Sequence, residues 1–71
     1  MDSKDVEKIF TYHPPTEEQR KKYETVRWTA KEFAKVINEN VPECTDKVEV
    51  INKLREAVMF ANAAIALNGL V

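Results

Sequence analysis

The sequence is poor in the residue types on which many enzymes and small stabilised domains depend. Its 71 residues include one cysteine, one histidine and one glycine. Cys44 has no second cysteine with which to form a disulfide, and Cys44 and His13 together supply too few ligands for a structural zinc site. A chain with a single glycine has no glycine-rich phosphate-binding loop. We therefore expect neither a metal nor a cofactor.

Excess charge and long apolar runs are also lacking. The formal net charge is −1, whereas proteins that bind polymeric nucleic acid normally carry a strong basic excess. The longest nearly apolar run, residues 57–67, is about half the length of a membrane span. The N-terminal segment MDSKDVEKIF lacks the apolar core of a signal peptide. These features favour a soluble, intracellular protein that binds neither a membrane nor polymeric nucleic acid.

The three prolines divide the sequence into pieces that carry helix signals. The predicted elements are a short helix over residues 3–9, a linker over 10–16, a long helix over 17–40 and a second long helix over 46–68. Thr16 and Gln19 form a capping box before the first long helix, and Ser3 and Thr45 are the expected caps of the other two. The chain is therefore predicted to be a single all-α domain.

Each long helix carries one apolar stripe at helical spacing. The stripes comprise Tyr23, Val26, Ala30, Phe33, Ile37 and Val41, then Ile51, Leu54, Val58, Ala61 and Ile65. A short loop joins the two helices, so they are predicted to pack as an antiparallel hairpin.

The last helix carries a second apolar stripe, made of Val50, Ala57, Phe60, Ala64 and Leu67. Either the short first helix covers this stripe, or copies of the chain associate through it. The first helix is too short to cover the area, and a chain of this length is marginal as a monomer. We therefore expect a homo-oligomer, in which Asn62 needs a hydrogen-bond partner and fixes the register of packing.

The segment FTYHPP, residues 10–15, is predicted to be extended and stiff, because residues before proline avoid the helical region. Tyr12 and His13 carry flat rings that suit stacking on nucleobases, and Pro14 lowers the entropy lost on binding. The alternative is that the rings fold back onto the core. We expect this of Phe10, and both interpretations remain open for Tyr12 and His13.

The first long helix has a local excess of positive charge, from Arg20, Lys21, Lys22, Arg27, Lys31 and Lys35. Arg27 and Lys31 share one face, where Arg27 suits a bidentate contact with phosphate. The alternative is an ordinary surface of ion pairs. Trp28 lies off the main stripe, and is either a second interface anchor or a lid over the hairpin. No enzyme is expected, since His13 and Cys44 are far apart in sequence and lack a third catalytic partner.

Three strings, FTYHPPTEEQ, YETVRWTAKEFAKVI and LREAVMFANAAIA, resemble the small phage-encoded anti-CBASS proteins that act as cyclic-oligonucleotide sponges. CBASS is a bacterial anti-phage immune system. The resemblance covers residues 10–68. It implies one short and two long antiparallel helices, assembled as a hexamer in the cytoplasm of the host bacterium.

The resemblance also implies the ligands. Members bind cyclic dinucleotides such as 3′,3′-cGAMP between paired protomers and cyclic trinucleotides where three protomers meet, without cleaving either. Tyr12 matches the pocket tyrosine, and Arg27 matches a cationic position that is lysine in some members. Lys8 and Asn68 are trinucleotide-site candidates on chemistry alone. The alternative function is a helical interaction module that binds a host protein through its alanine-rich face.

Overall fold

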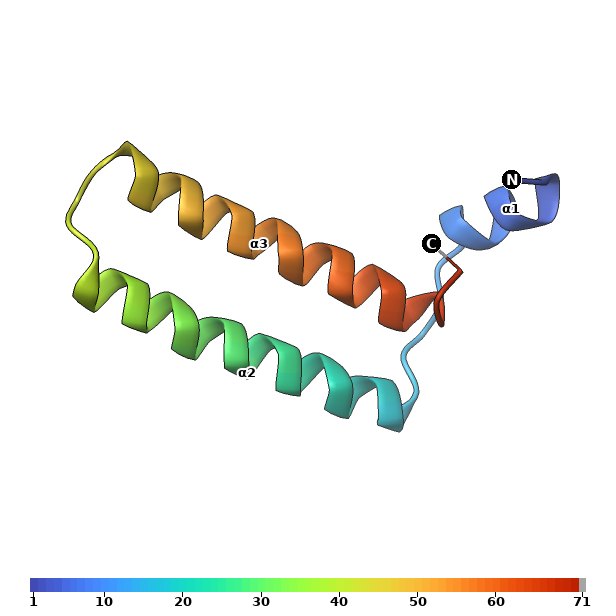
Figure 1. The fold of residues 1–71 in the computed structure, drawn as a ribbon. Helices are drawn as coiled ribbons and strands as arrows, with labels where there is room; N and C mark the ends of the chain where they lie inside the picture. The colour runs from blue at the N-terminus through green and yellow to red at the C-terminus, as the bar shows by residue number, and fades with distance from the viewer. Residues whose placement is uncertain (71) are drawn as a thin grey trace.

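The computed structural model of the protein describes residues 1–70, which contain three α-helices and no strand. The helices are α1 (Ser3–Phe10), α2 (Glu17–Asn40) and α3 (Thr45–Ala66). Helices α2 and α3 run antiparallel as a hairpin, and α1 projects from the end where α2 begins (Figure 1). The predicted all-α fold is confirmed. None of these helices combines the length and the apolar composition that crossing a bilayer requires.

The start of α2 is stabilised by the predicted capping box. The Thr16 hydroxyl accepts from the Gln19 backbone N–H at 3.1 Å, and the Gln19 side-chain oxygen accepts from the Thr16 N–H at 3.0 Å. The Gln19 amide nitrogen also donates to the carbonyl oxygen of Ile65 at 3.1 Å. One side chain therefore caps α2 and joins its first turn to the last turn of α3.

Two details predicted for the first helix are wrong. Asp2, not Ser3, is the cap: its carboxylate accepts from the Asp5 N–H at 2.9 Å, and the Asp5 carboxylate accepts from the Asp2 N–H. Phe10 was assigned to the linker, but α1 includes it. Proline restricts only the residue directly before it, so Pro14 constrains His13 and leaves Phe10 free to be helical.

The bounds predicted for the last helix need correction at both ends. Thr45 is its first helical residue, and Cys44 occupies the capping position without a side-chain hydrogen bond. The helix ends at Ala66 because Asn68 and Gly69 adopt left-handed conformations, with φ of 50° and 83°. Their N–H groups donate to the carbonyls of Ile65 and Ala64 at 3.3 and 3.0 Å. This hydrogen-bond pattern is a Schellman motif, which ends a helix.

The predicted stripes form the seam between α2 and α3, but they make a thin core. Ile37 is the one buried apolar side chain in residues 1–70, with 5% of its surface exposed. Leu54 and Val58 are half-buried, and Phe33 remains 54% exposed. Two helices alone bury one side of each stripe and leave the flanks open to solvent.

Lys47 fixes the loop between the long helices. Its side chain is buried, and its ammonium donates to the Asn38 carbonyl oxygen at 3.1 Å and pairs with the Glu43 carboxylate. Asn38 lies in the last turn of α2, where carbonyl groups lack partners inside the helix. A positive charge there also interacts favourably with the helix dipole. Lys47 therefore connects the end of α2 to the start of α3.

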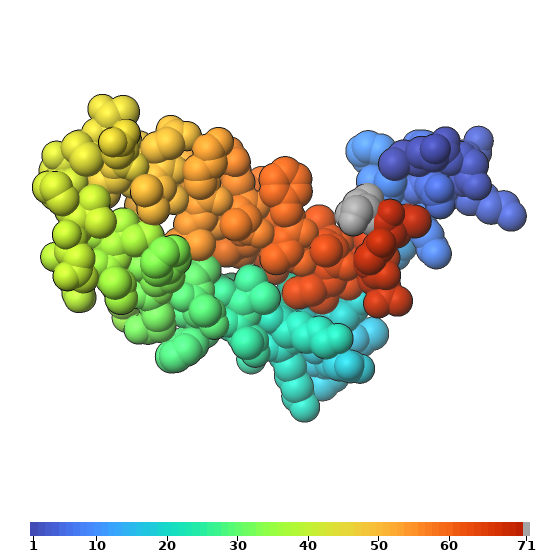
Figure 2. All heavy atoms as spheres, viewed as in Figure 1, coloured from blue at the N-terminus to red at the C-terminus, as the bar shows by residue number. Residues whose placement is uncertain are grey.

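The protomer leaves a large apolar surface uncovered. Helix α1 packs against neither α2 nor α3 (Figures 1 and 2). Phe10 is 85% exposed, so the expectation that it folds back onto the core is wrong for the chain by itself. The accessible surface is 5927 Å², against about 4500 Å² for a compact monomer of this mass. The radius of gyration is 15.3 Å, against about 11 Å for a compact domain.

Replacing Lys47 tests its role in closing the hairpin. We expect Lys47→Ala to lower the free energy of unfolding by about 1–3 kcal/mol, because the Asn38 carbonyl loses its partner. Urea denaturation at one fixed protein concentration measures this change. The control is Lys53→Ala, which removes only exposed ion pairs with Glu49 and Glu56 and should change stability by less than about 0.5 kcal/mol. Equal losses in both variants would contradict this role.

Candidate functional site

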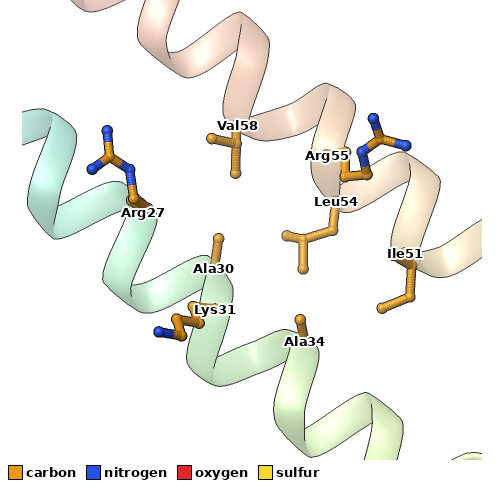
Figure 3. A pocket seen from close by; sticks show the side chains of 8 residues that line it. All are labelled: Arg27, Ala30, Lys31, Ala34, Ile51, Leu54, Arg55 and Val58. Carbon is orange, nitrogen blue, oxygen red and sulfur yellow. The ribbon is translucent and has the colours of Figure 1, made fainter.

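An open groove of about 460 Å³ runs along one side of the seam between α2 and α3. It is lined by Arg27, Ala30, Lys31 and Ala34 from α2 and by Ile51, Leu54, Arg55 and Val58 from α3. Its floor is apolar, and the small side chains of Ala30 and Ala34 keep it open. Figure 3 shows Arg27 and Lys31 on the α2 wall and Arg55 on the α3 wall. We call it the cationic groove.

The cations of this groove differ from most others on the hairpin. Five basic side chains pair with carboxylates: Arg20, Lys22, Lys35, Lys47 and Lys53. Within residues 1–70, Arg27, Lys31 and Arg55 have no such partner, and no acidic residue lines their groove. The alternative of an ordinary ion-paired surface therefore fails for Arg27 and Lys31. The groove presents positive charge around an apolar floor.

The other side of the same seam has different chemistry. A second groove of about 430 Å³ shares Ala30, Leu54 and Val58 with the first. Its remaining lining is uncharged, and consists of Thr25, Val26, Thr29, Phe33, Ala57 and Ala61. We call it the neutral groove. The hairpin thus separates a surface suited to anions from one suited to apolar packing.

Tyr12 and Pro14 lie outside the cationic groove. Both are exposed, Tyr12 to 80%, and both belong to the linker between α1 and α2. Arg27 lies ten residues beyond Glu17, the first residue of α2, which is about 15 Å along the helix axis. One chain therefore does not bring Tyr12 and Arg27 into one groove.

His13 has a structural contact that the sequence did not reveal. Its Nε2 lies 2.7 Å from the Lys8 carbonyl oxygen, and because a carbonyl only accepts, Nε2 is the donor. The Thr11 hydroxyl donates to the Glu7 carbonyl. Both contacts add donors to carbonyl groups in the last turn of α1, where helical hydrogen bonding is incomplete. The Lys8 carbonyl also accepts from the Thr11 backbone N–H at 3.4 Å. His13 and Lys8 also line an open hollow of about 510 Å³ beside α1, whose lining residues are all polar or charged.

Trp28 and Asn68, two further residues singled out from the sequence, lie in neither groove. Trp28 is 65% exposed, so it is not a lid over the hairpin, and a role as interface anchor stays a prediction. Asn68 is exposed and adopts a left-handed backbone conformation, which asparagine tolerates better than most residues do. Its established part is to end α3.

Arg55 is the groove residue that sequence reasoning missed. It follows Ile51 by four positions and precedes Val58 by three, so helical spacing alone places it beside the α3 stripe. That spacing does not show which α2 residues lie opposite. The hairpin register supplies this information, because Arg55 lines the same groove as Arg27 and Lys31.

The fold and the groove define a class: a small α-helical hairpin protein with a cationic groove over an apolar floor. No group of three histidine, cysteine or acidic side chains in residues 1–70 is placed to hold a metal ion.

The sequence matches the family model described as Acb2/Tad1, hairpin domain, over residues 1–66. The chain therefore belongs to this family of anti-CBASS, cyclic-oligonucleotide-binding proteins, which is a binding family and not a known enzyme family. No curated protein and no solved structure gives a match.

Proposed function

We propose that the protein sequesters cyclic oligonucleotide second messengers without cleaving them and so blocks bacterial CBASS immunity. The ligands are cyclic dinucleotides such as 3′,3′-cGAMP and, at separate sites, cyclic trinucleotides. The observation that carries this proposal is the cationic groove, found in a chain that belongs to the Acb2/Tad1 family. By this function the protein acts in the cytoplasm of the host bacterium.

The chemistry of the groove matches that of a cyclic dinucleotide. Arg27 presents a planar guanidinium that can donate two hydrogen bonds to one phosphate, and Lys31 adds a second charge on the same wall. The floor around Leu54 accepts the apolar face of a base or a ribose. Binding and release need no bond to break, since attraction to phosphate and burial of apolar surface suffice for sequestration.

We propose that the binding unit is a homo-oligomer, a hexamer by family resemblance. The accessible surface exceeds that of a compact monomer by about 1400 Å², whereas a standard interface covers about 800 Å² on each partner. This excess supports contacts with more than one neighbour. The Asn62 side-chain oxygen is buried and has no hydrogen-bond partner within residues 1–70. Because this oxygen is shielded within the single chain, a second copy would reach it only if the Asn62 side chain turned outward. The role of Asn62 in fixing the register of packing stays a prediction.

Helix α1 supports the same conclusion. An isolated helix of eight residues is not stable in water, and α1 has no cover from the hairpin of its own chain. Its apolar side chains, Val6, Ile9 and Phe10, follow the spacing of one helix face. Contact with another copy would stabilise α1 and would determine where the attached linker places Tyr12.

The ligand pocket is proposed to lie between paired protomers. Tyr12 and Arg27 are separated within one chain, so a ligand that touches both needs two chains. In a two-fold pair each residue occurs twice, which suits a ligand with two bases and two phosphates. Tyr12 stacks on a base, and Pro14 and His13 hold the linker in an extended form. Lys8 and Asn68 remain proposals for the trinucleotide site.

A thermal-shift panel of cyclic dinucleotides and trinucleotides tests the function. A ligand that binds only the folded state stabilises it by about 2.7 kcal/mol when its free concentration is one hundred times its dissociation constant. This stabilisation raises the melting temperature. We expect at least one cyclic dinucleotide to do so and to be recovered chemically intact after heating. If no nucleotide shifts the melting temperature and a host protein co-purifies, the result supports the alternative function as a host-protein interaction module, with the neutral groove as its binding surface. A cleaved ligand would indicate an enzyme.

Tyr12→Ala tests the stacking residue. We expect cyclic dinucleotide affinity to fall at least about tenfold, because stacking on one base contributes about 1–3 kcal/mol. Isothermal titration calorimetry measures this loss, and light scattering should return the wild-type mass. Tyr12→Phe keeps the ring and is the matched control, with affinity within a few fold of wild type. Unchanged affinity in Tyr12→Ala would remove this residue from the site.

Ala61→Glu tests the neutral groove as the surface that joins copies. Ala61 is half-buried in that groove, and a carboxylate there would be desolvated without a counter-charge. We expect a lower mass by light scattering. Asn52→Glu places the same charge on an exposed position of α3 and should leave the mass unchanged. A wild-type mass for Ala61→Glu would place the interface elsewhere.

A further inference from the structure

Arg55 has no role in the sequence-based account of the ligand site, yet it completes the cationic groove. It is the one basic residue that α3 contributes to the lining. In Figure 3 it stems from the helix opposite Arg27 and Lys31, and its guanidinium lies over α3 at the edge of the groove. The side chains between the two walls are apolar. Positive charge therefore borders the groove on both sides.

Basic side chains without a carboxylate partner are concentrated at this groove. The described part of the hairpin, residues 17–70, has four basic side chains without an acidic partner, namely Lys21, Arg27, Lys31 and Arg55. Three of the four line this one groove. Arg27 and Lys31 are four positions apart on α2, and like charges at that spacing destabilise a helix slightly. A local cost with no structural compensation is typical of a functional site.

We propose that Arg55 is a further phosphate-binding residue, which holds a phosphate of the cyclic oligonucleotide from the α3 wall. This inference rests on the proposed function and extends it. Arg27 and Lys31 bind from the α2 wall, and the macrocycle lies over the floor between them. A ligand with phosphates at two edges of a ring reaches both walls, whereas a ligand with one phosphate reaches only one.

The two walls therefore select for ligands with at least two phosphates. A guanidinium gives directional, bidentate contacts with phosphate oxygens, which a lysine ammonium does not reproduce. The volume of about 460 Å³ lies within the usual range for small-molecule sites. Polymeric nucleic acid is a poorer fit, because the cationic surface is one short groove on a protein of net charge −1.

The test is titration calorimetry of 3′,3′-cGAMP into Arg55→Gln. We expect affinity to fall about tenfold or more, as for other hydrogen bonds between charged groups. Lys53→Gln is the matched control, since it removes one positive charge from the same helix at a residue outside the cationic groove. Its affinity should stay within about twofold of wild type. Arg55→Lys should bind with intermediate affinity, and adenosine monophosphate should lose far less than 3′,3′-cGAMP on Arg55→Gln.

The outcomes separate this inference from the proposed function. If wild type binds no cyclic oligonucleotide, both are overturned. If wild type binds, Arg27→Gln weakens binding and Arg55→Gln matches Lys53→Gln, only the role of Arg55 is overturned. Light scattering accompanies each titration. A changed mass for Arg55→Gln would overturn the inference as well, because it would make Arg55 an assembly residue.

Discussion

The structure depends on the packing of α2 against α3 along two apolar stripes. That contact places Leu54 and Val58 opposite Ala30 and fixes the register of the helices. Because Ala30, the α2 residue that lines both grooves, has a small side chain, the grooves remain open on both sides of the seam. The same contact is also insufficient, since Ile37 is the one apolar side chain it buries in residues 1–70. Both the thin core and the proposed two-chain ligand pocket support the proposal that copies of the chain associate.

In the proposed function, one side of the hairpin serves assembly and the other serves ligand binding. The neutral groove has mainly apolar and hydroxyl side chains, whose burial against another chain costs little free energy. The cationic groove has guanidinium and ammonium groups, whose burial against another cation is unfavourable. A sponge of small anions needs both properties. The positive charge that attracts the ligand must be concentrated in one place, because the protein as a whole has a net charge of −1. Such a net charge gives little general attraction for polyanions. Three unpaired cations in one groove meet this requirement.

The segment FTYHPP combines helix-ending contacts with an exposed aromatic ring. Thr11 and His13 satisfy the last carbonyls of α1, so the segment ends one helix before Thr16 begins the next. Tyr12 lies between these structural contacts and is left exposed. The sequence indicated that the rings have a special place but did not separate their roles. The folded chain shows a hydrogen bond that gives His13 a structural contact, and it leaves Tyr12 exposed. Ligand roles for both residues stay predictions.

The sequence by itself determined the features that depend on near neighbours in the chain: three helices, the Thr16–Gln19 capping box, and the stripes that pair the long helices. It misplaced Ser3 as a cap, Phe10 in the linker and the end of α3, since local competition between neighbouring caps decides such boundaries. Only tertiary structure brought Arg55 to the groove of Arg27 and separated Tyr12 from both. Helical periodicity gives the face of a residue on its own helix, whereas the residue opposite is decided by packing between distant segments.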